Sequence, residues 1–321
     1  MAKVSVIIPV YKVEKYIELC ATSLFSQTLD DIEFIFVDDC GGDKSFDILH
    51  STLEKFPHRK SQVKILQNAH NMGVGQSRQR GVDFATGDYI IHCDPDDWVD
   101  VDMYELMYDK AIETDAEIVV CGFVNEFSDR SVVELQTVKG GKEKLFYDLV
   151  IGELHCSLCN KLVKKNLAKK YRIEKGVNLW EDKSIVIPMM CDAEKIESIE
   201  KSPYHYRIAS DISIVHNYSK ENSRSKIAAV EIIRKHMQHA GHSKLLDSHV
   251  MRLEELKAKQ GLLSLYPPEI NKWRTTFPES NTHYNDKAHI NLGYRVYATL
   301  LKYRLDFMDH VISKLVYLKN K

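Results

Sequence analysis

Four groups of polar residues each follow an apolar run that is typical of a strand. The densest is Asp94-Pro95-Asp96-Asp97, in which three carboxylates lie within four residues and repel one another unless a cation lies between them. Hard divalent ions such as Mg²⁺ or Mn²⁺ prefer oxygen ligands and usually combine one or two protein carboxylates with substrate phosphates. The triplet therefore indicates a metal and phosphate site, and an acidic turn that caps the following helix is the alternative.

The other three groups offer contacts for a phosphate-bearing ligand. Pro9-Val10-Tyr11 ends the first apolar run, Asp38-Asp39 ends the second, and Asn71-Met72-Gly73-Val74-Gly75 leads from the third to Arg78. Glycines let the backbone approach a ligand closely, and the guanidinium of Arg78 can hold diphosphate oxygens in a forked geometry. No G-x-G-x-x-G follows the first run, which disfavours NAD. Solvated loops and a plain helix entry are the alternatives.

Alternating strands and helices must position these groups. Apolar runs predict strands over residues 4–9, 32–37, 63–66, 89–93 and 117–120. Helical spacing of apolar residues predicts helices over residues 13–24, 46–53, 74–85 and 101–113. This order predicts an α/β fold with a doubly wound, mainly parallel sheet covered by helices on both faces. Ligands of such sheets bind at the carboxyl ends of the strands, where all four groups would meet.

The remainder of the chain predicts a helical extension. We expect a catalytic domain over 1–218, with a nucleotide-binding half over 1–120 and an acceptor-side half over 121–218, followed by helices over 219–321. Residues 266–281 contain three prolines and are predicted to form a connection, and a last helix is predicted over residues 292–316. Basic residues flank the apolar stripe of that helix. It could therefore lie on an anionic membrane, or pack on the catalytic domain or on a second subunit of a homodimer.

Bulk composition narrows the partners and the compartment. A formal net charge of −2 on 321 residues gives no field that favours nucleic acid. No apolar stretch approaches the roughly 20 residues needed to cross a bilayer, so we expect a cytoplasmic protein, in contact with the inner membrane face at most. The seven scattered cysteines favour reduced thiols, and the Cys156-x-x-Cys159 pair is interpreted as packing.

In their order and spacing, the four groups resemble the family 2 glycosyltransferases of the GT-A fold, over residues 3–215. Ser77 and Gln79 depart from the usual alanine and asparagine of that family. The resemblance implies that Asp96 ligates Mn²⁺ or Mg²⁺ and that Asp94 holds the ribose. It also implies that the nucleotide is bound by residues from three strand ends, namely Pro9, Tyr11, Asp39, Asn71, Gly73 and Arg78.

The resemblance also implies the chemistry. Trp180-Glu181-Asp182 resembles the acidic pair that opens a helix in that family, which makes Asp182, together with Glu181, the expected catalytic base. Lys161, His205 and Arg207 are candidates for contact with the acceptor or the diphosphate. The implied reaction is inverting transfer of a sugar from a nucleoside diphosphate, with UDP as the expected nucleotide. The acceptor would be a saccharide or a lipid-linked molecule, in the synthesis of a capsule or another surface polysaccharide.

Two other functions remain open at this point. A sugar nucleotidyltransferase also uses a doubly wound sheet, a metal and carboxylates, but usually has a glycine- and basic-rich loop after the first strand. A glycosyltransferase-like binding protein without activity is the second alternative, against which the intact acidic groups argue.

Overall fold

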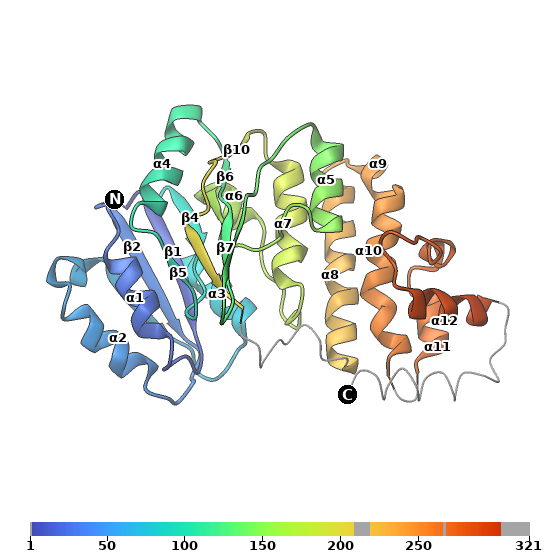
Figure 1. Ribbon diagram of the computed structural model, residues 1–321, viewed down its shortest axis with the longest axis horizontal. Helices are drawn as coiled ribbons and strands as arrows, with labels where there is room; N and C mark the ends of the chain where they lie inside the picture. The colour runs from blue at the N-terminus through green and yellow to red at the C-terminus, as the bar shows by residue number, and fades with distance from the viewer. Residues whose placement is uncertain (1, 209–218, 266–267, 303–321) are drawn as a thin grey trace.

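The computed structural model of the protein describes residues 2–208, 219–265 and 268–302 (Figure 1). A seven-stranded sheet with the strand order β10-β6-β9-β4-β1-β2-β3 forms its centre. The strands are β1 (Val4–Val10), β2 (Ile32–Asp38), β3 (Val63–Gln67), β4 (Tyr89–His92), β6 (Ile118–Val120), β9 (Lys161–Lys164) and β10 (Ile196–Ser198). All neighbouring strands run parallel except β9, which is antiparallel to both β4 and β6.

Helices cover both faces of this sheet because alternate residues of each strand point to opposite sides. Val6 and Ile8 of β1 share a core with α1 (Ile17–Phe25) and α4 (Met103–Thr114). Ile7 instead packs against α3 (Val74–Phe84) on the other face. The remaining helices of this part are α2 (Ser45–Leu53), η1 (Pro57–Gln62), α5 (Lys142–Ile151), α6 (Lys165–Lys170) and α7 (Glu181–Asp192).

A second, four-stranded sheet lies beside the first and has the order β5-β11-β7-β8. Its strands are β5 (Trp98–Val99), β7 (Phe123–Glu126), β8 (Ser131–Glu134) and β11 (Tyr204–Arg207). β11 pairs with both β5 and β7, which brings the segment after the acidic triplet next to residues 204–207.

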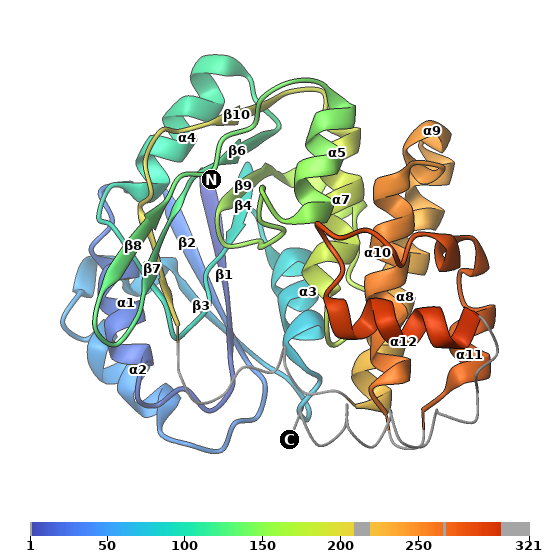
Figure 2. The same cartoon turned by 45° about the vertical axis from the view of Figure 1, so that its right-hand side comes forward.

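The C-terminal helices stand against α5 and α7 at the far end of the main sheet (Figures 1 and 2). They are α8 (Lys220–His239), α9 (Ser243–Leu246), α10 (His249–Lys259), η3 (Gln260–Leu263), α11 (Ile270–Thr275), η4 (Pro278–Thr282) and α12 (Leu292–Lys302). Val230, Ile233 and Met237 of α8 are buried in the same core as Ile187 of α7. The helices α8, α9 and α10 therefore share one apolar core with α5 and α7, and α11 and α12 belong to a second core with residues of α8 and α10.

The predicted α/β class, the mainly parallel sheet and the C-terminal helices are confirmed. The predicted connection over 266–281 is wrong within its described part, because α11 and η4 form there. Pro278 stands at the start of η4, where a missing N–H costs no hydrogen bond, and Trp273 of α11 is buried. The boundary predicted at residue 218 lies outside the described residues.

The last predicted helix is described only as far as Lys302, and the rest of residues 292–316 lies outside the described residues. Within α12, Tyr297 and Leu301 are buried in a core with Trp273, whereas Leu292 and Val296 are exposed. This part of the apolar stripe packs on the protein itself. No described helix is both long enough and apolar enough to cross a bilayer. All seven cysteines are free thiols, and Cys40 is the exposed one.

Candidate active site

The four polar groups singled out in the sequence meet at one pocket of about 520 Å³, at the carboxyl ends of β1, β2 and β4. Its walls combine strand ends, the first turns of α3 and two asparagines from later in the chain. The lining residues are Pro9, Val10, Tyr11, Asp39, Asn71, Gly73, Val74, Ser77, Arg78, Asp94, Pro95, Asp96, Asn178 and Asn222. The parallel sheet thus brings together residues between positions 9 and 96 on one edge, and Asn178 and Asn222 join them from outside the sheet.

Asp39 fixes the loop that enters α3. Its carboxylate is 3% exposed and accepts hydrogen bonds from the Asn68 side chain (2.8 Å) and from the backbone N–H groups of Met72 (2.7 Å) and Gly73 (2.9 Å). Gly73 has φ 84°, a conformation that glycine adopts without steric cost. Asn71 supports the same turn by accepting from the Gly73 N–H at 3.0 Å. A carboxylate has about four acceptor positions, so Asp39 retains capacity for a ligand donor.

Arg78 links two carboxylates that are far apart in the sequence. Its Nη2 donates to Asp94 Oδ1 at 2.6 Å, and its Nη1 donates to Glu181 Oε1 at 2.8 Å. Burial disfavours the charged guanidinium and would lower the pKa of Arg78. The attraction of the Asp94 and Glu181 carboxylates is larger than this effect and raises that pKa above its ordinary value. Arg78 therefore stays cationic and joins the end of β4 to the first turn of α7.

The acidic triplet divides into one structural carboxylate and two that line the pocket. Asp97 is 1% exposed and accepts from the Tyr204 hydroxyl (2.6 Å) and from the Arg207 backbone N–H (2.8 Å), which anchors β11. Burial, and next to it the carboxylate of Asp94, raise the pKa of Asp96. Asp94 and Asp96 thus place negative charge side by side at the pocket wall, where a cation would stabilise it.

Glu181 and Asp182 open α7, as the sequence predicted. Trp180, which precedes them, has φ 66°, a left-handed conformation that is uncommon for a bulky residue. Burial, followed by the neighbouring Asp182 carboxylate, raises the pKa of Glu181 to about 7 despite its ion pair with Arg78. Asp182 is less buried and accepts from the backbone N–H of Lys183 at 2.6 Å. Glu181 is therefore joined to the pocket wall through Arg78, and neither Glu181 nor Asp182 is among the residues that line the pocket.

The three basic residues that were predicted to contact the acceptor or the diphosphate lie in different surroundings. Lys161 is 1% exposed, and its ammonium donates to the carbonyl oxygens of His155 (2.6 Å) and Ser157 (2.9 Å) and to Asn160 Oδ1 (2.8 Å). Its three donors thus hold the loop over residues 155–160. Lys161 does not line the pocket.

His205 and Arg207 both lie against the Trp98 ring. The His205 ring stacks on Trp98 at 5.1 Å between centroids and contacts the carboxylates of Glu126 (2.8 Å) and Asp100 (3.1 Å). The guanidinium of Arg207 lies 4.9 Å from the Trp98 ring centroid, and its Nε donates to the Asp96 carbonyl oxygen at 2.9 Å. Arg207 is thus the basic candidate that the structure brings beside the acidic triplet.

Sequence reasoning missed two residues of the pocket wall, Asn178 and Asn222. Asn178 precedes α7 and Asn222 lies in the first turn of α8, which the sequence assigned to a separate extension. Neither belongs to a motif, so only the three-dimensional arrangement identifies them.

Comparison with known proteins agrees with this geometry. Residues 5–172 match the family described as Glycosyl transferase family 2. The putative glycosyltransferase EpsH of Bacillus subtilis (strain 168) is 30% identical over 71% of this chain and 67% of its own length. EpsJ, an uncharacterized glycosyltransferase of the same strain, is 28% identical over 64% of this chain and 60% of its own length. The chain therefore spans less than two thirds of EpsJ.

A solved structure supports the fold. The crystal structure of S. aureus TarS 1-349 in complex with UDP-GlcNAc superposes with a TM-score of 0.68 at 16% identity, covering 98% of this chain and 90% of that chain. The likeness extends over the C-terminal helices, so these helices are part of the shared architecture.

Proposed function

The chain belongs to glycosyl transferase family 2, and we propose that this glycosyltransferase moves a sugar from a nucleoside diphosphate, UDP, to a saccharide or lipid-linked acceptor with inversion. The observation that carries the proposal is the convergence of Asp39, Arg78, Asp94 and Asp96 on one pocket of about 520 Å³. This volume lies within the range of about 300–1,000 Å³ typical of small-ligand sites. TarS, which has the same fold, binds UDP-GlcNAc.

The residues of the pocket fit a divalent cation, Mn²⁺ or Mg²⁺. Asp96 would hold it together with the diphosphate oxygens of the donor, because burial and the neighbouring Asp94 carboxylate disfavour the charged form of Asp96, which a cation would stabilise. In the described part of the chain, no three His, Cys, Asp or Glu side chains could hold a metal by themselves, so substrate oxygens would complete the site. When bound, such an ion would supply positive charge to stabilise the leaving diphosphate.

The protein's own groups would supply the remaining chemistry. Asp182 accepts the proton of the acceptor hydroxyl while that oxygen bonds to the anomeric carbon and the bond from this carbon to the diphosphate oxygen breaks. Arg78 holds Asp94 and Glu181 in fixed positions and adds positive charge beside the diphosphate. Asn178 and Asn222 offer amide groups at the wall of the pocket.

Calorimetric titration of UDP and UDP-sugars, with and without Mn²⁺, tests the proposal. We expect Mn²⁺-dependent binding that is lost in Asp96→Asn and retained in Asp129→Asn. Asp129 is an exposed carboxylate that pairs only with its neighbour Arg130 among the described contacts, so it controls for the loss of one negative charge. Equal Mn²⁺-dependent binding by the wild type and Asp96→Asn would refute the role of Asp96.

The released product then separates transfer from the other reactions. A nucleoside diphosphate released only in the presence of an acceptor supports sugar transfer. Release of pyrophosphate would refute it, and so would the absence of turnover with every nucleotide sugar that binds.

A further inference from the structure

The segment Asn178–Lys183 carries a pocket-lining asparagine and the acidic pair, yet residues of the C-terminal helices hold it. The first tether is Ser225 of α8, which is 3% exposed. Its hydroxyl accepts from the backbone N–H groups of Asn178 and Leu179, both at 2.9 Å, and donates to the Leu179 carbonyl oxygen at 3.0 Å. One side chain of α8 thus satisfies three backbone groups immediately before Trp180.

The second tether reaches the first turn of α7 from α10. Glu254 of α10 is fully buried and forms a salt bridge with Lys183. The Lys183 ammonium also lies 4.6 Å from the centroid of the Trp180 ring, and Lys226 of α8 lies 5.1 Å from the same ring. Because Trp180 has a left-handed backbone, the contacts around it must offset the steric cost of that conformation.

The same helix also reaches the donor pocket. Asn222 lies one helical turn before Ser225 on α8 and lines the pocket together with Asn178. We propose that Ser225 and Glu254 are positioning residues that hold Asn178–Lys183 in place, so that α8 and α10 complete the active site. The expected effect on turnover rests on the proposed function, because it requires that Glu181 and Asp182 serve catalysis.

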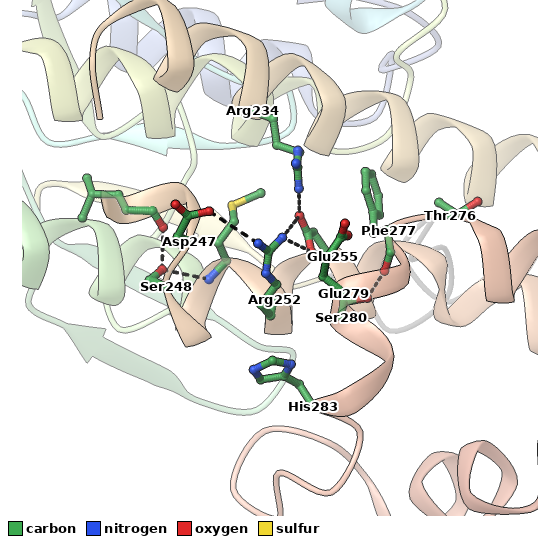
Figure 3. A network of polar contacts seen from close by, with 12 residues as sticks. Arg234, Asp247, Ser248, Arg252, Glu255, Thr276, Phe277, Glu279, Ser280 and His283 are labelled. Atoms are coloured by element: carbon green, nitrogen blue, oxygen red, sulfur yellow. Dashed lines mark hydrogen bonds and ion pairs between the residues drawn. The ribbon is translucent and has the colours of Figure 1, made fainter. Parts of the chain in front are cut away.

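Two neighbouring residues provide matched controls within the same helices. Glu255, next to Glu254, is also fully buried, but its partners Arg234 and Arg252 belong to α8 and α10 themselves (Figure 3). Ser223 lies two residues before Ser225 and is 2% exposed. Its hydroxyl donates at 3.0 Å to the carbonyl oxygen of Ser219, the N-cap of α8. Neither control residue has a described hydrogen bond to Asn178–Lys183.

The test compares Ser225→Ala with Ser223→Ala and Glu254→Gln with Glu255→Gln in the full chain. Hydrogen exchange of the backbone amides over residues 178–183 measures the positioning directly, and kcat with its pH profile measures the consequence. We expect faster exchange in this segment and a kcat lower by about 10- to 100-fold in Ser225→Ala and Glu254→Gln only. All four variants should lose thermal stability.

A double-mutant cycle with Lys183→Met checks the route of the Glu254 effect. If Glu254 acts through Lys183, the double variant has about the kcat of the more damaged single variant rather than the product of both losses. Unchanged exchange over 178–183 in Ser225→Ala and Glu254→Gln would overturn the positioning role, as would equal changes in all four variants. Faster exchange with a normal kcat would uphold the positioning and instead refute the catalytic assignment of the acidic pair.

Discussion

Arg78 makes charged hydrogen bonds to Asp94 and Glu181 at once, and this fork cannot be reproduced by an ammonium. We therefore expect Arg78→Lys to lower kcat/KM by about 10²-fold, the scale seen when a group that stabilises charge is lost. Steady-state kinetics of donor turnover would measure this change.

Arg80→Lys is the matched control for that substitution. Arg80 lies on the same helix but donates to the Gln67 carbonyl oxygen and to Asn68 Oδ1, away from the acidic pair. A similar loss of activity in both variants would show that the fork at Arg78 has no special part in the reaction.

Asp182→Asn should separate binding from chemistry. Asparagine keeps the size of the side chain but cannot accept a proton, so kcat should fall by about 10²–10⁴-fold while calorimetry shows unchanged donor affinity. Asp192→Asn at the other end of α7, where the carboxylate pairs with Lys170, should retain turnover. Near-normal kcat in Asp182→Asn would remove Asp182 as the base.

The pKa of Glu181 predicts how stability depends on pH. Burial and Asp182 raise this pKa from 4.5 to about 7, so between these values the folded protein binds a proton that the unfolded chain releases. The contribution of Glu181 to stability therefore falls as pH rises from 4.5 to 7. Thermal melts should show the wild type losing stability relative to Glu181→Gln across this window. A difference that stays constant with pH would contradict the raised pKa.

Among single residues, the sequence predicted which side chains meet at the pocket. It did not predict which polar side chain is buried in hydrogen bonds to a loop. Asp39, Asp94, Asp96 and Arg78 could be placed together because parallel strands end at one edge of a sheet. The burial of Lys161 could not be predicted, because its three acceptors belong to a loop whose course depends on the rest of the fold. The roles assigned to the pocket residues toward a ligand stay predictions.

Among the elements, the contact of α3 with β1 depends on a small residue. A Cβ at Gly81 would lie 2.4 Å from Ile7 Cγ2, which is closer than real Cβ contacts. Gly81→Ala should therefore lower the free energy of unfolding by about 1–3 kcal/mol, as overpacking does. A Cβ at Gly293 in α12 would meet only Asn291 Oδ1, at 3.8 Å. Gly293→Ala should therefore not destabilise the protein. Chemical denaturation of both variants measures the difference, and equal stabilities would contradict this packing.

The parallel strands and long helices were predictable, since continuous apolar runs and helical periodicity are local signals. The antiparallel insertion of β9 between β4 and β6 was not, because no local pattern reports which strands become neighbours. The second sheet was missed for a related reason. Its strands are short, and they pair across about 80 residues between β7 and β11.

The core that α7 shares with α8 and α10 joins the main sheet to the C-terminal helices. Removing residues 219–321 would expose Ile187 and its neighbours in that core to water, so we expect the 1–218 fragment to be insoluble or to lack a cooperative thermal transition. Differential scanning calorimetry and binding of a hydrophobic dye would measure this. A soluble 1–218 fragment with a sharp transition would show that the helices are a separable domain.

The exposed thiol of Cys40 has a practical consequence. Cys40 follows Asp39 directly, and the other cysteines are buried or half-buried. A thiol-reactive fluorophore should therefore attach first at Cys40, whose neighbour in the chain, Asp39, lines the pocket and is a predicted nucleotide contact. Its emission would report the arrival and departure of nucleotides in real time, without a radioactive donor or a known acceptor.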